Sequence, residues 1–279
     1  MDILETIVAN KRREVAGQKA AVSLEMLLSA GAARMSRPAV SMRRALEQSP
    51  SGIIAEFKRR SPSKGWLHAG ARVEDILPAY EQGGASACSV LTDGDFFGGS
   101  LGDLQRARTR VRLPLLRKDF IIDEYQLYQA RVTGADAVLL IAATLTPGEC
   151  RQLAQTAHTL DLEVLLEIHR ESELDYLHPE IDLLGVNNRH LGTFHTEVEN
   201  SFRLIRQIRA SGAETASPLP VSESGLSEAA TVVRLREAGF RGFLIGETFM
   251  KTDHPGRALA AFITQIDRQT EHRHETTDH

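Results

Sequence analysis

The chain has little cysteine and no long apolar run. Cys88 and Cys150 are the only cysteines among its 279 residues, and no closely spaced histidines accompany them. Two isolated thiols exclude a disulfide framework and a cysteine–histidine zinc cluster, so we expect no metal. No apolar run approaches the ~18 residues that a membrane-spanning helix needs.

The chain also lacks an excess of either charge. The formal net charge is −4, with acidic and basic residues scattered, which indicates no nucleic-acid or membrane partner. The N-terminal stretch MDILETIVANKRREVAG has an acidic residue at position 2 and lacks the basic-then-apolar order of a secretory signal. We therefore expect a cytoplasmic protein.

Eight short apolar segments recur along the chain. They begin near residues 52, 85, 113, 136, 162, 181, 218 and 241 and read GIIAEF, ASACSVL, LPLLRK, DAVLLIAA, LEVLLEI, IDLLGVN, PLPVSE and RGFLIGE. Helical patterns lie between them, and three of these patterns end at Gly84, Gly134 and Gly239, as capped helices do. Apolar strands alternating with amphipathic helices indicate a parallel sheet covered by helices.

The number and spacing of these units predict a (β/α)8 TIM barrel over residues 51–266 of a single domain. Eight βα units in about 250 residues are typical of this closed barrel. A doubly wound open sheet is the alternative, but the dinucleotide-binding version carries a glycine fingerprint after its first strand. The stretch EFKRRSPSKG has none.

Both ends of the chain extend beyond the predicted barrel. Residues 1–50 contain three amphipathic helical patterns, which form an N-terminal helical arm. This arm either closes the floor of the barrel or folds over the open end and helps to cover a ligand. Residues 267–279 are polar, and we expect them to form a disordered tail whose irregularly spaced histidines predict no metal site.

Polar and charged residues stand where the apolar segments end. They are Glu56 and Lys58, Lys118, Glu167, Asn187 and Arg189, Glu223, and Glu247. In a TIM barrel the C-terminal ends of the strands surround the active site. Charges at the ends of several separate strands do not fit one solvated helix face. We therefore predict an active site at this mouth, with an internal salt-bridge network as the alternative.

The last two segments predict a phosphate site. The stretch SESGLSE supplies Ser224 and Gly225 and begins a helix, and LIGETF supplies Gly246 and the amide of residue 247. Loop amides and helix N-termini at this place in the fold often hold phosphate, although either stretch alone could be an ordinary turn.

Apolar side chains stand near the same strand ends. Phe97, Phe120, Leu191 and Phe194 follow the apolar segments rather than lying within them. Packing in the core explains any one of them, whereas four in the rim loops suggest a wall for a flat apolar group.

Several stretches resemble the indole-3-glycerol-phosphate synthase family of tryptophan biosynthesis. They are IAEFKRRSPSKG, LTDGDFFGGSLGDL, LLRKDFIIDEYQLYQARVTGADAVLLIAA, LEVLLEIH, LGVNNRHLGTF, VSESGL and FLIGETFM. The resemblance runs through the barrel in order, and ILETIVANKRREV is similar to the family's opening helix. It implies that 1-(2-carboxyphenylamino)-1-deoxyribulose 5-phosphate is closed, decarboxylated and dehydrated to indole-3-glycerol phosphate without a cofactor.

The resemblance also implies a role for each matching residue. Lys118 matches the general acid, Glu167 the general base, and Glu56 with Lys58 a second catalytic pair. Asn187, which we count as catalytic, and Arg189 match groups that hold a substrate hydroxyl or carboxylate. The substrate-binding matches are Ser224, Gly225, Gly246 and Ser61 for the phosphate, Pro62, Phe97, Phe120, Leu191 and Phe194 for the anthranilate ring, and additionally Glu223 and Glu247.

Two positions depart from the family pattern. Gly98 follows Phe97 where Asn or Gln is expected, so we expect one polar contact fewer there. Glu247 stands where Ser or Thr is frequent. Because its carboxylate would repel a phosphate, we expect the side chain to point away and the amide alone to contribute.

The chemistry is consistent with these residues. Ring closure places negative charge on a ketone oxygen, which a lysine can stabilise and protonate. The carboxylates of Glu56 and Glu167 should keep Lys118 protonated. Dehydration then needs an acid for the leaving hydroxyl and a base for a ring proton. The basic loop after Lys58 is expected to be a lid.

Two other functions remain open at this point. One is a phosphate-binding barrel isomerase, such as phosphoribosylanthranilate isomerase, which would use a Cys or Asp acid–base pair. The other is a sensor that binds a phosphorylated ligand without turning it over. In each case we expect a monomer with a small phosphorylated ligand.

Overall fold

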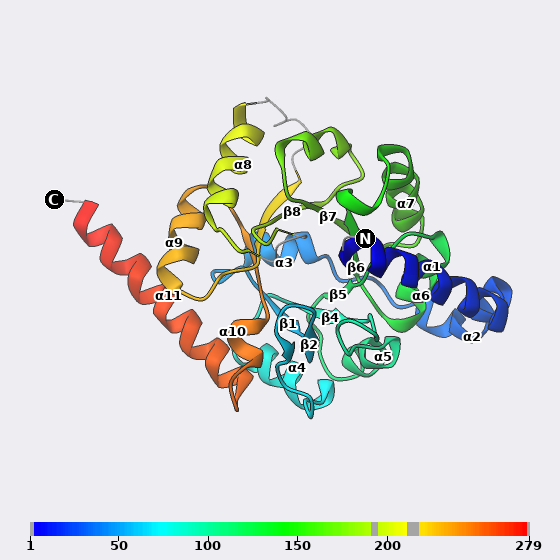
Figure 1. Ribbon diagram of the computed structural model, residues 1–279. Coiled ribbons are helices and arrows are strands. Elements are labelled where there is room, and N and C mark those ends of the chain that lie inside the picture. The colour runs from blue at the N-terminus through cyan, green and yellow to red at the C-terminus, as the bar shows by residue number, and fades with distance from the viewer. Residues whose placement is uncertain (1–2, 191–194, 211–217, 278–279) are drawn as a thin grey trace.

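The computed structural model describes residues 3–190, 195–210 and 218–277 of the protein. In this part of the chain eight parallel strands close into a barrel enclosed by helices, which confirms the predicted TIM barrel (Figure 1). The strands are β1 (Ile53–Phe57), β4 (Ala87–Leu91), β5 (Leu115–Lys118), β6 (Ala137–Ile141), β7 (Glu163–Ile168), β8 (Leu183–Asn187), β9 (Leu219–Glu223) and β10 (Gly242–Ile245). Successive barrel strands pair in order, and β1 closes the ring between β10 and β4.

Helices follow the strands around the outside of the barrel (Figure 1). They are α4 (Val73–Gln82), α5 (Leu101–Arg108), α6 (Glu124–Thr133), α7 (Pro147–Thr159), α8 (Glu199–Ala210), α9 (Ala229–Glu237), α10 (Glu247–Met250) and α11 (Pro255–Thr277), with 3-10 turns η1 (Ala142–Thr144) and η2 (Glu171–Tyr176). Gly84, Gly134 and Gly239 have φ values of 94°, 96° and 112° just after α4, α6 and α9. These left-handed conformations confirm the predicted helix ends, because glycine adopts them without a steric penalty.

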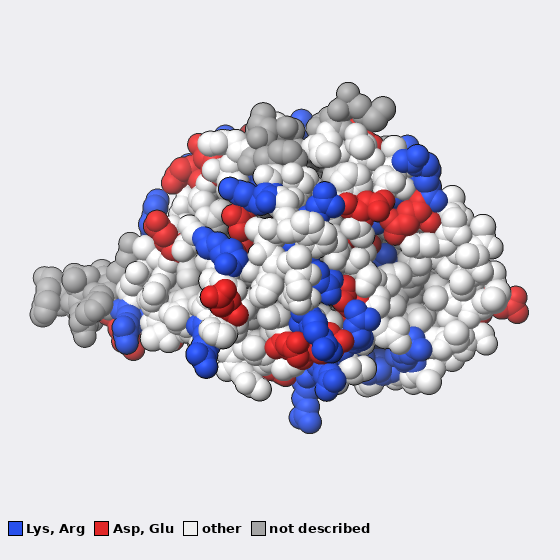
Figure 2. Space-filling view, turned by 60° about the horizontal axis from the view of Figure 1, so that its bottom comes forward, with Lys and Arg blue, Asp and Glu red and all other residues white. Residues whose placement is uncertain are grey.

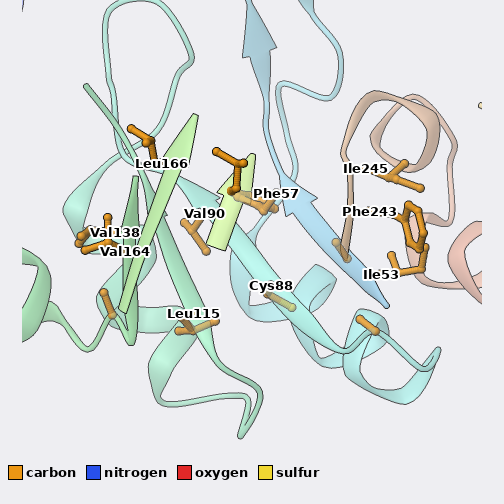
Figure 3. Close-up of a cluster of buried hydrophobic side chains, with 14 of the residues drawn as sticks. Ile53, Phe57, Cys88, Val90, Leu115, Val138, Val164, Leu166, Phe243 and Ile245 are labelled. Atoms are coloured by element: carbon orange, nitrogen blue, oxygen red, sulfur yellow. The ribbon is translucent and has the colours of Figure 1, made fainter. Parts of the chain in front are cut away.

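The strands pack on two faces with a period of two residues. One face meets the helices, and Figure 3 shows its side chains, among them Phe57, Val90 and Leu166. The other face fills the barrel interior, where Ile54, Leu116, Leu139, Leu165 and Leu244 belong to one buried cluster. Toward the C-terminal end of each strand, the next residues on this inner face lie at the mouth of the barrel.

The N-terminal arm contains α1 (Ile3–Ala21), α2 (Leu24–Met35) and α3 (Met42–Gln48), and it does both things that the sequence left open. Met42 and Leu46 of α3 are buried against the barrel interior at its floor. At the opposite end, Ile3, Leu4 and Ile7 of α1 line a cavity at the mouth. The arm therefore closes the barrel below and covers the site above.

The prediction of a disordered tail from residue 267 is wrong up to residue 277, because α11 continues to Thr277. Leu259, Phe262 and Ile266 anchor the earlier part of this helix in the core. After Gly256 the helix contains no glycine or proline, and extending a nucleated helix costs little. Its far end projects from the barrel (Figure 1).

The molecular surface mixes both signs of charge. Figure 2 shows basic and acidic side chains interspersed over one face rather than separated into large areas of one sign. Among the helices described here, none combines the length and apolar character needed to cross a bilayer.

Candidate active site

A cavity of about 620 Å³ opens where the barrel strands end. Most of the predicted site residues line it, and they come from segments spread along the whole barrel sequence. They are Glu56, Lys58, Pro62, Phe97, Lys118, Phe120, Glu167, Asn187, Arg189, Glu223, Ser224, Gly225, Gly246 and Glu247. Leu191 and Phe194 lie outside the described residues.

Ser61 does not line this cavity. Its side chain is buried, and its Oγ accepts a hydrogen bond from the amide of Lys64 at 3.2 Å. The expectation that Ser61 binds phosphate therefore finds no support in its position. Its hydroxyl instead stabilises the turn that presents the neighbouring residues Pro62, Ser63 and Lys64 to the cavity.

Lys118 lies between two glutamates. It ends β5, and its Nζ is 3.2 Å from Oε2 of Glu167 and 3.5 Å from Oε2 of Glu223. Burial by itself would lower the pKa of this lysine, but the carboxylates of Glu167, Glu223 and Glu56 together raise it well above its ordinary value. The ammonium is therefore charged at neutral pH.

The two glutamates beside Lys118 differ in protonation. Burial tends to raise the pKa of Glu167, but the charge of Lys118, with contributions from the neighbouring His169 and a hydrogen bond from Asn187, lowers the pKa to about 2. Burial, together with the nearby charges of Glu167 and Glu56, raises the pKa of Glu223 to about 8 despite Lys118. Two titratable groups whose pKa values are pushed apart in this way are characteristic of acid–base sites.

Glu56 and Lys58 form a second ion pair, with Oε1 and Nζ 2.5 Å apart. Burial would raise the pKa of Glu56, but Lys58 and Lys118 lower it overall. Both residues lie on the inner face of β1 and its extension, two positions apart, as the sequence predicted.

Two glycines make room for these carboxylates. A Cβ at Gly246 would collide with the carboxylate of Glu56, and a Cβ at Gly185 would collide with that of Glu223. In each case the glycine lies on the strand or strand end next to that of the glutamate. The carboxylates thus occupy space that a side chain on the adjacent strand would otherwise fill.

The loop after Lys58 folds into a small hairpin, β2 (Arg60–Ser61) and β3 (Gly65–Trp66). Trp66 packs over Gly98, where an added Cβ would lie 3.0 Å from its ring and where φ is 66°. The Trp66 ring thus occupies the space that a side chain at position 98 would need.

The predicted phosphate site has an unusual backbone. Ser224 and Gly225 have φ values of 68° and 75°, and a Cβ at Gly225 would lie 2.5 Å from Cγ2 of Thr196. A left-handed serine costs on the order of 1–3 kcal/mol and tends to occur at functional sites. Lys251, which the sequence analysis did not identify, adds a basic group to this side of the cavity.

Glu247 does not point away from the cavity as expected. Its Oε2 lies 3.4 Å from the guanidinium of Arg189, which is also 3.3 Å from Oγ of Ser63 in the hairpin turn. The pairing partly neutralises the carboxylate, which reduces its repulsion of an anion. Arg189 thus links the hairpin to the start of α10.

One side of the cavity is apolar. Phe97 and Phe120 have ring centroids 6.1 Å apart, and Leu139 and Ile141 of β6 lie on the same lining. The residues of α1 complete it. The sequence analysis missed these α1 residues because amphipathic periodicity identifies the buried face of a helix but not its location.

Lys11 fixes α1 over the mouth. Its side chain is buried, and Nζ lies 2.9 Å from Asp119 and 3.0 Å from Asp93. Burial would lower the pKa of Lys11, but Asp119 and Asp93 raise it overall. Asp119 follows Lys118 directly, so the arm is joined to the strand that carries the central lysine. No sequence signal distinguished Lys11 from its solvated neighbours.

Comparison with known proteins agrees with the geometry. The family model for indole-3-glycerol phosphate synthase matches residues 4–262. An indole-3-glycerol phosphate synthase of Bacteroides thetaiotaomicron is 59% identical over 266 residues, which cover 95% of this chain and 99% of the relative. The relative from Neisseria gonorrhoeae, with the same name, is 45% identical over 258 residues, covering 91% and 96% of the two chains.

A solved structure also shares the fold. Tryptophan synthase subunit alpha from Legionella pneumophila aligns with a TM-score of 0.58 at 13% identity and covers 81% of this chain and 98% of that chain. At this identity the similarity shows the barrel alone. The isomerase alternative would need a Cys or Asp acid–base pair. Neither cysteine lines the cavity described here, and Asp119, which does, is held in ion pairs with Lys11 and Arg117.

Proposed function

The chain belongs to the indole-3-glycerol phosphate synthase family and is a carboxy-lyase of tryptophan biosynthesis, and we propose which of its side chains carry each step. The reaction closes, decarboxylates and dehydrates 1-(2-carboxyphenylamino)-1-deoxyribulose 5-phosphate, which gives indole-3-glycerol phosphate, CO2 and water. The observation that carries the assignment is the position of Lys118 between an ionised and a largely protonated glutamate.

The substrate lies across the cavity from the phosphate side to the apolar side. Its phosphate binds at Ser224, Gly225 and Gly246, and its anthranilate ring rests against Phe97 and Phe120. Arg189, with Asn187, holds the substrate carboxylate or hydroxyl, since a guanidinium offers several donors in a fixed plane.

Ring closure depends on Lys118. As the aromatic carbon attacks the ketone, the ketone oxygen gains negative charge, which the Lys118 ammonium stabilises and then protonates. Loss of CO2 restores the aromatic ring. The neighbouring carboxylates keep this lysine charged until the substrate oxygen takes its proton.

Dehydration depends on Glu167. The hydroxyl takes a second proton from a lysine of the site and leaves as water, and Glu167 removes a proton from the new five-membered ring. Its lowered pKa means that the carboxylate is ionised and ready to accept that proton. Lys58, paired with Glu56, acts mainly on the phosphate or carboxylate of the substrate as a point charge.

We place this activity in the cytoplasm and in a monomer. The substrate is a phosphorylated metabolite, which supports the cytoplasmic assignment.

The experiment is a turnover assay with the purified chain and the phosphorylated substrate. With the wild-type chain, indole absorbance or fluorescence should appear together with one CO2 per product. The Glu167→Gln variant should have a lower kcat with little change in KM, because glutamine keeps the shape and hydrogen bonding of the side chain but cannot take a proton. A collapse of substrate affinity with kcat unchanged would make Glu167 a binding group. Absence of indole with the wild-type chain would contradict the activity itself.

A further inference from the structure

His169 stands behind the general base, outside the cavity lining. It follows the last residue of β7, and its Nε2 lies 3.4 Å from Oε1 of Glu167. The other oxygen of Glu167 faces Lys118. The carboxylate thus has the lysine on its cavity side and the imidazole on its other side.

A second carboxylate lies on the far side of the imidazole. Nδ1 of His169 is 3.8 Å from Oε2 of Glu173 in η2, and Oε1 of Glu173 is 2.9 Å from Nε of Arg170. The Arg170 side chain is 70% exposed, whereas that of Glu173 is 6% exposed. Glu173 therefore lies next to a residue in bulk water.

The ring nitrogens of His169 are unusual in this environment. Both are buried, and neither makes a hydrogen bond of ordinary geometry among the described residues. The charged groups that face the ring are Glu167 from β7 and Glu173 from η2. The side chain of Asn200 in α8 donates to the backbone carbonyl of His169 and not to its ring. Buried polar atoms are normally paired, so an imidazole held between two carboxylates indicates a role that needs both nitrogens.

The proposed reaction requires a proton from water in every turnover. Two protons go to the former ketone oxygen before it leaves as water, and one returns from ring carbon to Glu167. One proton is therefore taken up in each turnover. It balances the negative charge of the substrate carboxylate, which leaves as neutral CO2. Lys118 and Glu167 have side chains only 14% and 3% exposed, and bound substrate fills the mouth above them.

We propose that Glu173 and His169 form a proton relay that recharges Lys118 through Glu167 from the outer side of the barrel. The relay rests on the proposed roles of Lys118 and Glu167. After Lys118 has given up its proton, Nε2 of His169 transfers a proton to Oε1 of Glu167, whose Oε2 transfers one to Nζ of Lys118. At the same time Nδ1 of the neutral imidazole takes a proton from water by way of Glu173, and tautomer exchange in the free enzyme restores the Nε2–H before the next turnover. Each transfer breaks one N–H or O–H bond and forms another.

The test compares the first turnover with later ones in His169→Gln. CO2 release requires only the proton already stored on Lys118, so the first equivalent per active site should appear near the wild-type rate. Later turnovers should be at least ~10-fold slower, because a glutamine amide does not relay protons. Imidazole added to the buffer should restore part of the steady rate. Glu173→Gln should show the same pattern with a smaller loss.

His158→Gln is the matched control, because His158 also pairs with a carboxylate, 2.9 Å from Asp182, but on the outside of the barrel. It should leave both phases unchanged. If His169→Gln slows both phases equally and imidazole has no effect, His169 merely orients Glu167 and the relay is wrong. An unchanged steady rate also overturns the relay. If His169→Gln does not fold, Glu173→Gln decides by the same criteria. Normal turnover in Glu167→Gln would instead contradict the proposed base.

Discussion

The two ends of β7 carry glutamates that face the same barrel interior but have different surroundings. At the floor, Glu163 accepts hydrogen bonds from Oγ of Ser41 at 2.5 Å and from the amides of Met42 and Arg43 at 2.7 and 2.9 Å. At the mouth, Glu167 contacts the side chains of Lys118 and His169 instead. Backbone donors cannot move or titrate, whereas lysine and histidine can do both.

Asp136 shows the same pattern at the floor. Its carboxylate accepts from the amides of Val40 and Leu115, each at 2.9 Å, and pairs with Arg37 and Arg108 at 2.6 and 2.8 Å. A buried carboxylate held by backbone amides and by arginines, which stay charged, stabilises the fold. A carboxylate paired with titratable side chains is available for chemistry.

The largest expected effect is at the mouth. Lys118→Ala should reduce kcat by at least ~10²-fold, the usual scale for a positioned acid, while the melting temperature stays near that of the wild type. Steady-state kinetics and a thermal melt measure the two quantities. Near-normal turnover would mean that Lys118 takes no part in the chemistry. The functional difference between the mouth and the floor would then lose its main support.

The second effect tests the floor. Asp136→Asn keeps the shape but weakens the contacts with two arginines and two amides, so the free energy of unfolding should fall by about 1.5–3 kcal/mol. Denaturant unfolding measures this, and kcat of the remaining folded enzyme should be unchanged. A loss of kcat without a loss of stability would mean that the floor carboxylate affects the chemistry at the mouth.

The third effect sharpens the comparison within the mouth. Lys58→Ala should raise KM several-fold, on the order of the effect of one lost charge contact, and also slow the reaction, whereas Lys118→Ala should mainly slow it. The effect of Lys58 on KM should shrink as ionic strength rises, because salt screens an open charge contact. If Lys58→Ala lowers only kcat at every salt concentration, Lys58 is a proton donor.

The smallest effect concerns the pH dependence of stability. The pKa of Glu223 is raised to about 8 in the folded protein, so between pH about 5 and 8 the folded state binds the extra proton and wild-type stability falls as pH rises. Gln at this position does not titrate. Glu223→Gln should therefore gain stability relative to the wild type as pH rises through this range, by on the order of 1 kcal/mol per pH unit. Unfolding free energies at several pH values measure the difference, and a constant difference would contradict the raised pKa.

The sequence predicted the features that depend on local periodicity. Eight apolar segments alternating with helical patterns predicted the barrel, and the two-residue period of a strand places Glu56, Lys118 and Glu167 on the inner face at the mouth. It could not determine contacts between distant segments. The position of α1, the pairing of Glu247 with Arg189 and the carboxylates around His169 depend on how loops and helices pack in three dimensions.

The prediction for the tail relied on the amino-acid composition of the segment, and it failed for a reason other than contacts between distant segments. The tail looked disordered because it is polar, but α11 carries helical structure through it to Thr277. Ser61 was assigned to the phosphate from the family resemblance, and its hydroxyl accepts a hydrogen bond from the turn that follows it. Polar composition reports exposure, and it does not distinguish a turn or an extended helix from a binding loop.

The glycines beside the mouth carboxylates constrain how this enzyme can evolve. Alanine at position 185 or 246 would collide with the carboxylate of Glu223 or Glu56, so such a change requires the opposing glutamate to leave its place at the mouth or to be shortened. The order of substitutions therefore matters, and the intermediate with alanine first would be purged. Lineages that keep these glutamates should keep both glycines, and a library that randomises each position singly would find neither exchange.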